Sequence, residues 1–300
     1  MKKLFLLLFC LMASACAATP TPRVVTYQPQ GTILFSAASV EGDGKFNLFT
    51  MNADGSNRQP LPAPAGEALG AKWSPDGKSI ALSAQENDVA QIFVMSADGK
   101  NRRQLTRVKN AINVEWSPDG KQLAFVSNDY GQYDIYTINN DGTGLRRITH
   151  DAGDHLQPAW SPDGGKLAYA AALSTSQQFS NTFQLFVTDL NGNAEQITNA
   201  EGVDYQYPSW SRDGKKLVFA ADPTGAYEIY AMDFAARDAK PLTKSGDPST
   251  QPRFSPDDKL ILYTVFTPDG WRLHLMTADG GAQTPIDNKN TSEFFGDWKK

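Results

Sequence analysis

The chain has 300 residues, a formal net charge of −5, and 40% hydrophobic and 20% charged residues. This composition is typical of a globular protein with a substantial core, and it argues against a disordered chain and against a membrane-spanning fold. The basic residues are scattered, so the broad Lys/Arg patch that binds a phosphate backbone is missing and we expect no nucleic-acid partner.

Residues 1–16 have the pattern of a secretory signal peptide. Lys2 and Lys3 precede an apolar run from Leu4 to Met12, which is shorter than the roughly 20 residues that a membrane-spanning helix needs. Both cysteines, Cys10 and Cys16, lie in this segment, so we expect no disulfide in the folded body.

The end of this segment, Ala13-Ser14-Ala15-Cys16, resembles a lipoprotein cleavage box. Ordinary signal cleavage after Ala15 would suit the same residues, so plain secretion is the alternative. We expect Cys16 to carry a lipid that is the only membrane contact, and residues 17–30, which include the Pro-rich AATPTP, to form a stiff tether.

Residues 31–300 contain a repeat with a period of 43 to 50 residues. Its copies are WSPDGK at Trp73 and Trp116, WSPDGGK at Trp160, WSRDGK at Trp210 and FSPDDK at Phe254. Each copy is followed by an apolar run such as IALSA, a polar loop, a second run such as QIFVMS, a turn and a short further strand. Four short strands separated by turns form one blade of a β-propeller.

The two ends of the repeat complement each other. The first copy has strand patterns at 32–37, 47–52 and 58–61 but no WSPDG segment before them, whereas FGDWK at 295–299 repeats the beginning of the motif. We therefore predict an all-β, six-bladed β-propeller over residues 31–300, closed by pairing of the C-terminal strand into the first blade. Such closure removes open sheet edges, and we expect a monomer.

The WSPDGK copies, together with strands such as DIYTIN from Asp134, resemble the propeller repeats of the TolB family of periplasmic proteins. Similar repeats occur in the propeller domains of prolyl oligopeptidase-like peptidases, whose hydrolase domain has no counterpart in this sequence. TolB itself has an N-terminal α/β domain, whereas only a short segment separates the signal from the first strand here. The resemblance implies a stand-alone propeller, periplasmic or attached to the cell surface, that binds a partner.

Several conspicuous residues have a structural interpretation. An Asp in a Pro-Asp-Gly turn accepts hydrogen bonds from nearby backbone N–H groups, which is the role we predict for Asp76, Asp119, Asp163, Asp213 and Asp257. The recurring aromatic residues should pack between blades. The fragments 52–55 and 139–142 are interpreted as hairpin turns rather than calcium loops. His150 and His155 lie in one loop and His274 in a strand, a placement that disfavours a zinc site, and we expect no metal and no cofactor.

Two kinds of loop crowd one face of a propeller: those between the second and third strands of a blade, and those leading to the next blade. One of them, from Ser174 to Thr182, is expected to be a longer loop. Loops on a rigid scaffold commonly carry function, and aromatic residues are favoured at recognition sites. We hypothesise that this face binds a protein, a peptide or an envelope glycan through Tyr130, Tyr133, His155, Tyr205, Tyr207, Tyr227 and Trp271.

The alternative is a propeller enzyme, such as a polysaccharide lyase or a lactonase-type hydrolase, with its site at the channel mouth. An enzyme would need ionisable groups close together, and the candidates are His150, His155, Asp154, Asp204 and Glu115. A hydrogen bond between His155 and Asp204 would favour this alternative. No GxSxG, GxxxxGK or GxGxxG motif is present, which favours a non-catalytic binding protein.

Overall fold

The structure, a computed structural model, describes residues 29–39, 46–62, 68–175, 178–244, 246–286 and 291–299. Within these ranges the chain forms strands and turns, and it has no helix that is long and apolar enough to cross a membrane. The predicted signal peptide with Cys16, and the tether up to residue 28, lie outside the described residues.

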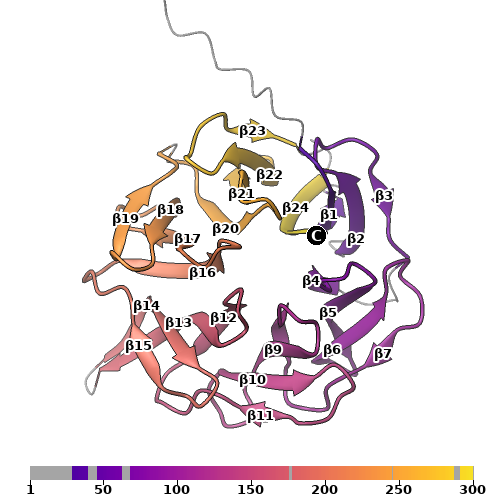
Figure 1. The fold of residues 1–300 in the computed structure, drawn as a ribbon, viewed down its shortest axis with the longest axis horizontal. Coiled ribbons are helices and arrows are strands. Elements are labelled where there is room, and N and C mark those ends of the chain that lie inside the picture. Colours follow the sequence, from indigo (N-terminus) through magenta and orange to yellow (C-terminus); the bar gives the residue numbers. More distant parts are fainter. Residues whose placement is uncertain are drawn as a thin grey trace, which may run out of the picture.

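Six four-stranded antiparallel sheets surround a central axis, as Figure 1 shows. From the innermost to the outermost strand, blade 1 consists of β24 (Thr291–Trp298), β1 (Thr32–Ser39), β2 (Asn47–Asn52) and β3 (Gln59–Pro60). In the same order, blade 2 consists of β4 (Ala68–Trp73), β5 (Ser79–Glu86), β6 (Val89–Ser96) and β7 (Arg103–Gln104). Blade 3 consists of β8 (Ile112–Trp116), β9 (Gln122–Ser127), β10 (Asp134–Asn139) and β11 (Arg146–Arg147).

The second half of the ring repeats the same order. Blade 4 consists of β12 (His155–Trp160), β13 (Lys166–Thr175), β14 (Gln178–Asp189) and β15 (Ala194–Gln196). Blade 5 consists of β16 (Asp204–Trp210), β17 (Lys216–Asp222), β18 (Glu228–Asp233) and β19 (Asp238–Pro241). Blade 6 consists of β20 (Ser249–Phe254), β21 (Leu260–Thr267), β22 (Gly270–Thr277) and β23 (Thr284–Pro285).

The ring closes through the two ends of the repeat. Strand β24 pairs antiparallel with β1, with Ile33 opposite Trp298 and Ala38 opposite Ser292. The Lys299 N–H donates a further hydrogen bond to the Thr32 carbonyl oxygen, at 2.8 Å. In Figure 1 the last strand, in yellow, therefore lies beside the first, in indigo. The predicted six-bladed fold and its closure by the C-terminal strand are confirmed.

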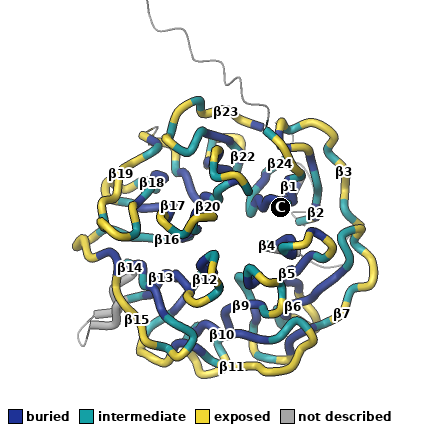
Figure 2. Tube along the Cα trace, viewed as in Figure 1, coloured by how far each residue is buried: buried dark blue, intermediate teal, exposed yellow. Residues whose placement is uncertain are grey.

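The hydrophobic core lies between neighbouring blades. Trp116 of blade 3 packs with Ile92 and Leu105 of blade 2, and Trp298 of blade 1 packs with Leu262 of blade 6. Figure 2 shows buried residues along the middle strands of each blade and exposed residues along the outermost strands. These contacts confirm the prediction that the repeated aromatic residues pack as wedges between blades. The apolar area that they remove from water stabilises the ring.

The repeated aspartates stabilise the turns as predicted. In the first copy the Ser74 hydroxyl donates to Asp76 Oδ1 at 2.7 Å, and the Lys78 N–H donates to the same oxygen at 3.1 Å. The same two hydrogen bonds recur at Asp119, Asp163, Asp213 and Asp257. Asp54 and Asp141 accept turn N–H groups in the same way, and no group of three potential metal ligands occurs in the described ranges.

One loop expectation is wrong. The segment from Ser174 to Thr182 is largely an extension of the hairpin formed by β13 and β14, in which Ser174 pairs with Phe179 and Thr175 with Gln178. The polar Ser/Thr/Gln composition suggested a loop, but ladder hydrogen bonds between the two strands satisfy the backbone without requiring apolar side chains.

Candidate functional site

Every inner strand has an irregularity at the same place. The strand register shifts by a β-bulge in β4, β8, β12, β16, β20 and β24, three residues before the repeated aromatic residue. The residue in the bulge has a positive φ, between 52° and 61°, in all six blades: Gly70, Asn113, Gln157, Tyr207, Gln251 and Phe295. Side chains with a Cβ rarely adopt this conformation, and bulges commonly redirect a side chain at a functional site.

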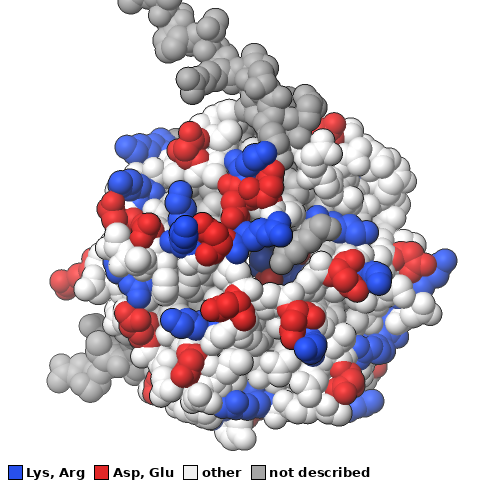
Figure 3. Space-filling view, viewed as in Figure 1, with Lys and Arg blue, Asp and Glu red and all other residues white. Residues whose placement is uncertain are grey.

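The six bulge residues all line one cavity on the central axis, with an empty volume of about 510 Å³ that includes some open solvent. Figure 3 shows the hollow at the centre of the disc, with Lys and Arg side chains next to Asp and Glu side chains around it. The remaining lining residues are Lys72, Val114, Glu115, Pro158, Pro208, Pro252, Arg253 and Gly296. The fold thus builds a cavity with both polar and apolar lining residues from one short segment of each blade.

Four charged side chains lie on consecutive blades around one side of the channel, from blade 6 through blades 1 and 2 to blade 3. Each directly precedes the repeated aromatic residue of its blade: Arg253, Asp297, Lys72 and Glu115. Arg253 forms an ion pair with Glu115, and its Nε lies 3.8 Å from Asp297 Oδ1. Blades 3 and 6 lie opposite each other in the ring, so this ion pair crosses the channel. Blades 4 and 5 have the uncharged Ala159 and Ser209 at the same position.

Burial governs the ionisation of this group of charges. Loss of hydration lowers the pKa of Lys72 to about 8, an effect that Arg253 strengthens and that Asp297 and Glu115 oppose. Burial also raises the pKa of Asp297 above its usual range, although Lys72 and Arg253 oppose that shift. A charged group that leaves water loses its hydration, which favours the neutral form of both the amine and the carboxyl.

The half of the ring formed by blades 4 and 5 is joined by a chain of hydrogen bonds. The Tyr207 N–H donates to Gln157 Oε1 at 2.7 Å, and Gln157 Nε2 donates to Gln206 Oε1 at 3.1 Å. Gln206 Nε2 in turn donates to Asp204 Oδ2 and to the Tyr227 hydroxyl oxygen, each at 2.8 Å. The Tyr227 hydroxyl donates to Asp204, and together with burial this raises the Tyr227 pKa. The chain links the cavity to the start of β16 and β18.

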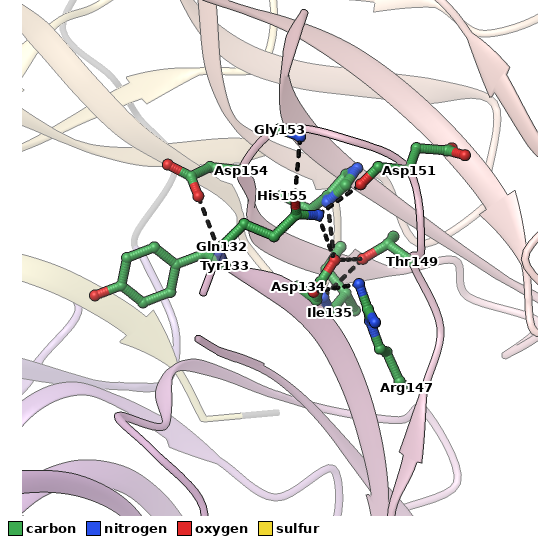
Figure 4. Close-up of polar contacts among 10 residues, drawn as sticks. All are labelled: Gln132, Tyr133, Asp134, Ile135, Arg147, Thr149, Asp151, Gly153, Asp154 and His155. Atoms are coloured by element: carbon green, nitrogen blue, oxygen red, sulfur yellow. Dashed lines mark hydrogen bonds and ion pairs between the residues drawn. The ribbon is translucent and has the colours of Figure 1, made fainter. Parts of the chain in front are cut away.

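His155 belongs to a separate buried cluster, shown in Figure 4. Its Nδ1 lies 3.3 Å from Asp134 Oδ1, and Arg147 lies 2.7 Å from the other oxygen of the same carboxylate. Thr149 donates to Asp134 at 3.2 Å and accepts the Ile135 N–H at 2.9 Å. Figure 4 shows the Tyr133 ring directed away from this cluster.

This cluster is a variant of a structural arrangement that other blades share. In blades 2, 4 and 5 as well, a threonine hydroxyl donates to a residue of the third strand and accepts the next backbone N–H. The pairs are Thr106 with Gln91, Thr198 with Gln184, and Thr243 with Glu228. Asp134 therefore stands where glutamine or glutamate stands elsewhere. Its carboxylate connects two strands of the blade, which accounts for its burial without a catalytic role.

The five residues of the enzyme alternative do not form one cluster. The Asp154 carboxylate accepts the Tyr133 N–H at 2.8 Å, and that of Asp204 accepts the Phe183 N–H at 2.7 Å. Glu115 pairs with Arg253, and His150 is exposed. In the described part of the chain no hydrogen bond joins His155 to Asp204, since the carboxylate beside His155 is Asp134.

The seven predicted binding residues have different environments. Tyr207 lines the cavity and Tyr227 is linked to it through Gln206. Tyr130 is 70% exposed with Arg147 over its ring, and Trp271 contacts the exposed Phe266. His155 is buried, and the remaining two, Tyr133 and Tyr205, pack partly against hydrophobic clusters between blades. The role of these seven residues in binding stays a prediction.

Sequence reasoning missed most of the cavity lining, including Lys72, Asn113, Gln251 and Arg253. A signal for them exists within the chain. When the six copies are aligned on the aromatic residue, the motif that follows it in five of them scarcely varies. In contrast, the residue three positions before it is Gly, Asn, Gln, Tyr, Gln or Phe, and the residue one position before it is Lys, Glu, Ala, Ser, Arg or Asp. Positions that vary between otherwise similar blades are the ones that face the axis.

The family model for the TolB beta propeller domain matches residues 32–300. A segment of 71 residues is 34% identical to the Tol-Pal system protein TolB of Hydrogenovibrio crunogenus, and covers 24% of this chain and 16% of that protein. A segment of 65 residues is 35% identical to the Tol-Pal system protein TolB of Legionella pneumophila, and covers 22% of this chain and 16% of that protein. The matched segments thus span about a sixth of the length of these curated relatives.

Solved structures show the same fold at low sequence identity. TolB from Acinetobacter baumannii superposes with a TM-score of 0.78 and 22% identity, covering 89% of this chain and 66% of that one. A puromycin-hydrolysing peptidase from Mycobacterium tuberculosis superposes with a TM-score of 0.60 and 15% identity, covering 85% of this chain and 45% of that one. Because this fold occurs both in TolB and in a peptidase, the fold alone does not assign a function.

Proposed function

Since this chain belongs to the TolB beta-propeller family, we propose that it is an exported, envelope-associated binding protein whose partner is another protein or a peptide. The names of its relatives as Tol-Pal system proteins support a protein partner and a periplasmic location. In this proposal the propeller is non-catalytic, and lipid on Cys16 holds it at a membrane.

The observation that carries the proposal is the central cavity. Its walls combine amide, phenol and charged side chains with proline, valine and phenylalanine side chains on six rigid strands, an arrangement that suits recognition of an inserted peptide segment. Three of the five ionisable residues of the enzyme alternative, Asp154, Asp204 and Glu115, instead accept backbone N–H groups or form an ion pair. These commitments support binding over turnover, since a general acid or base needs a free position next to a substrate.

We place the partner on the face formed by the predicted loops, with a segment of it entering the channel. Tyr207 and Tyr227 support this placement, because their hydrogen-bond chain runs from the cavity to the start of β16 and β18. Tyr130 is the most exposed of the seven predicted aromatic and histidine residues, and it would provide a contact on the rim. An envelope glycan on the same rim is the alternative occupant.

Site-specific photo-cross-linking tests the proposal. A benzoylphenylalanine residue replaces Tyr207 in the cavity, Tyr130 on the rim, or the exposed Lys240 on the outer strand β19 as a control. Irradiation in envelope extract should yield one protein adduct from the first two variants and none from the Lys240 variant. An adduct from the Lys240 variant alone would place the binding surface elsewhere. The mass of the mature N-terminus tests lipidation of Cys16.

A further inference from the structure

Lys72 in β4 is a buried cation with no hydrogen bond among the described residues. The residue is 8% exposed, and its nearest carboxylate oxygen, Asp297 Oδ1, is 3.9 Å from Nζ, beyond hydrogen-bond distance. An ammonium group has three donors and is strongly hydrated in water, so removing it from water without acceptors is unfavourable. A group in this condition is poised to accept an anionic partner.

The neighbouring charges are committed elsewhere. Asp297 Oδ2 accepts the Trp73 N–H at 2.8 Å, and Arg253 lies between the Glu115 and Asp297 carboxylates. Asp297 is therefore shared between a backbone group and two cations. Burial holds the pKa of Lys72 at about 8, so the ammonium form is still the main species at pH 7.

The bulge residue of the same strand leaves an opening beside Lys72. In the other five blades this position carries a side chain, whereas blade 2 has Gly70, with the same left-handed φ of 61°. A Cβ placed on Gly70 would have no atom within 4 Å. Gly70 and Lys72 both line the cavity, so the wall of blade 2 has a notch where Asn, Gln, Tyr or Phe projects from the others.

We propose that this notch, defined by Gly70 and Lys72, receives a carboxylate of the bound partner, the side chain of an Asp or Glu residue in the inserted peptide segment. The inference rests on the proposed function, because it names the chemistry recognised by the same cavity. The charges favour one carboxylate: the two cations Lys72 and Arg253 face Glu115 and Asp297, and among the described residues Arg253 donates a hydrogen bond to Glu115 whereas the Lys72 ammonium donates none. A phosphate dianion would bring a second negative charge next to those two carboxylates.

Two short probes test the proposal directly. N-acetyl-Gly-Asp-Gly-amide carries the carboxylate, and N-acetyl-Gly-Asn-Gly-amide is its neutral match. Trace labelling with acetic anhydride at pH 8, followed by mass spectrometry of each lysine, measures how far each probe protects Lys72 relative to the exposed Lys78. The Asp probe should protect Lys72 and the Asn probe should not. Equal protection by both probes would overturn the proposal.

Variants separate the charge from the notch. Lys72→Gln removes the cation, and Gly70→Gln fills the notch with a side chain that two other blades carry at this position, so that variant should fold. Each should weaken binding of the Asp probe, measured by NMR titration, by about tenfold or more, the loss expected for one hydrogen bond to a charged group. Lys78→Gln, on the exposed turn, should leave binding unchanged. Unchanged affinity in both cavity variants would overturn the proposal.

Further probes identify the source of the anion. Tighter binding of methyl glucuronide or inorganic phosphate than of the Asp probe would assign the notch to a glycan or phosphate ligand and overturn the peptide proposal. A protein that cross-links at position 207 but binds wild type, Lys72→Gln and Gly70→Gln equally would refute the carboxylate site while the proposed function stands. Selective protection of Lys72 by the Asp probe without any cross-linked partner would support the carboxylate site and contradict the proposed protein partner.

Discussion

The boundary between blades 5 and 6 departs from the repeat at two positions that contact each other. The motif has Pro two residues after the aromatic residue, and Arg212 replaces it in blade 5; it has Gly four residues after the aromatic, and Asp258 replaces it in blade 6. At three other boundaries this glycine faces the proline of the preceding blade, as Gly120 faces Pro75. Here the Arg212 N–H, which a proline lacks, donates to both Asp258 oxygens at 2.9 Å.

We predict that these two departures are energetically coupled. Asp258→Gly removes a charged acceptor from the Arg212 N–H but relieves an Asp residue at a φ of 58°. Arg212→Pro removes the donor and brings a proline ring against the carboxylate. In the double variant neither loss applies, because proline and glycine face each other as at those three boundaries. A hydrogen bond to a charged group is worth about 1.5–3 kcal/mol when buried, so for this partly exposed pair we expect a coupling of about 1–2 kcal/mol.

Urea unfolding followed by Trp fluorescence measures the four free energies of unfolding. Unchanged m-values across the wild type, both single variants and the double variant would show that the changes act on stability alone. The reverse transplant, Pro162→Arg with Gly214→Asp at the boundary of blades 4 and 5, is the matched control, and its double variant should be more stable than the sum of its single changes predicts. Coupling below about 0.5 kcal/mol, the usual limit of additivity, would refute the reasoning.

Two further predictions concern buried groups. The pKa of Lys72 is about 8 in the folded chain and near 10.5 in the unfolded chain, so the unfolded chain binds more protons between these pH values. The free energy of unfolding of wild type relative to Lys72→Met should therefore rise across that window by up to roughly 3 kcal/mol. Urea titration at pH 7.5, 9 and 10.5 measures this difference, and a difference that does not change with pH would contradict the burial of the Lys72 cation. Thr106→Val leaves the buried Ile92 N–H and the Gln91 side chain without the bridging hydroxyl and should lower the free energy of unfolding by about 2 kcal/mol. The control Thr143→Val, in an exposed turn, should lower it by less than about 0.5 kcal/mol. Equal losses in urea unfolding would refute the structural role of the threonine bridge.

The fold was predictable because its determinants recur. Each WSPDGK copy specifies the same inner strand, turn and second strand, and the FGDWK segment identifies the strand that closes the ring. Turn chemistry was equally legible, since the Asp76 carboxylate accepts hydrogen bonds within its own motif. The hairpin extension near Ser174 was missed because its polar residues lack the apolar alternation by which strands are recognised.

The site was less predictable because its residues stand at the positions of the repeat that differ from blade to blade. Aromatic residues on the loop face drew attention, yet of these only Tyr207 lines the cavity. The other five bulge residues reach the cavity because a bulge turns one residue of each inner strand toward the axis. No propensity of Asn113, Gln251 or Phe295 predicts a left-handed conformation in the middle of a strand. Only their common offset from the aromatic residue marks them.

The six bulges also explain how one ring can be rigid and specific at once. In five of the six blades the bulge holds a non-glycine residue at a positive φ, which is unfavourable. Such strain persists only where the hydrogen bonds of the sheet and the packing of the core enforce it. The Trp wedges and threonine bridges that enforce it lie outside the cavity, so a change at a bulge position alters the wall without altering the frame. Blade 2 illustrates the consequence: its glycine adopts the conformation of the other bulges without a side chain, and the space that it leaves adjoins the one ring cation without a hydrogen bond in the described residues.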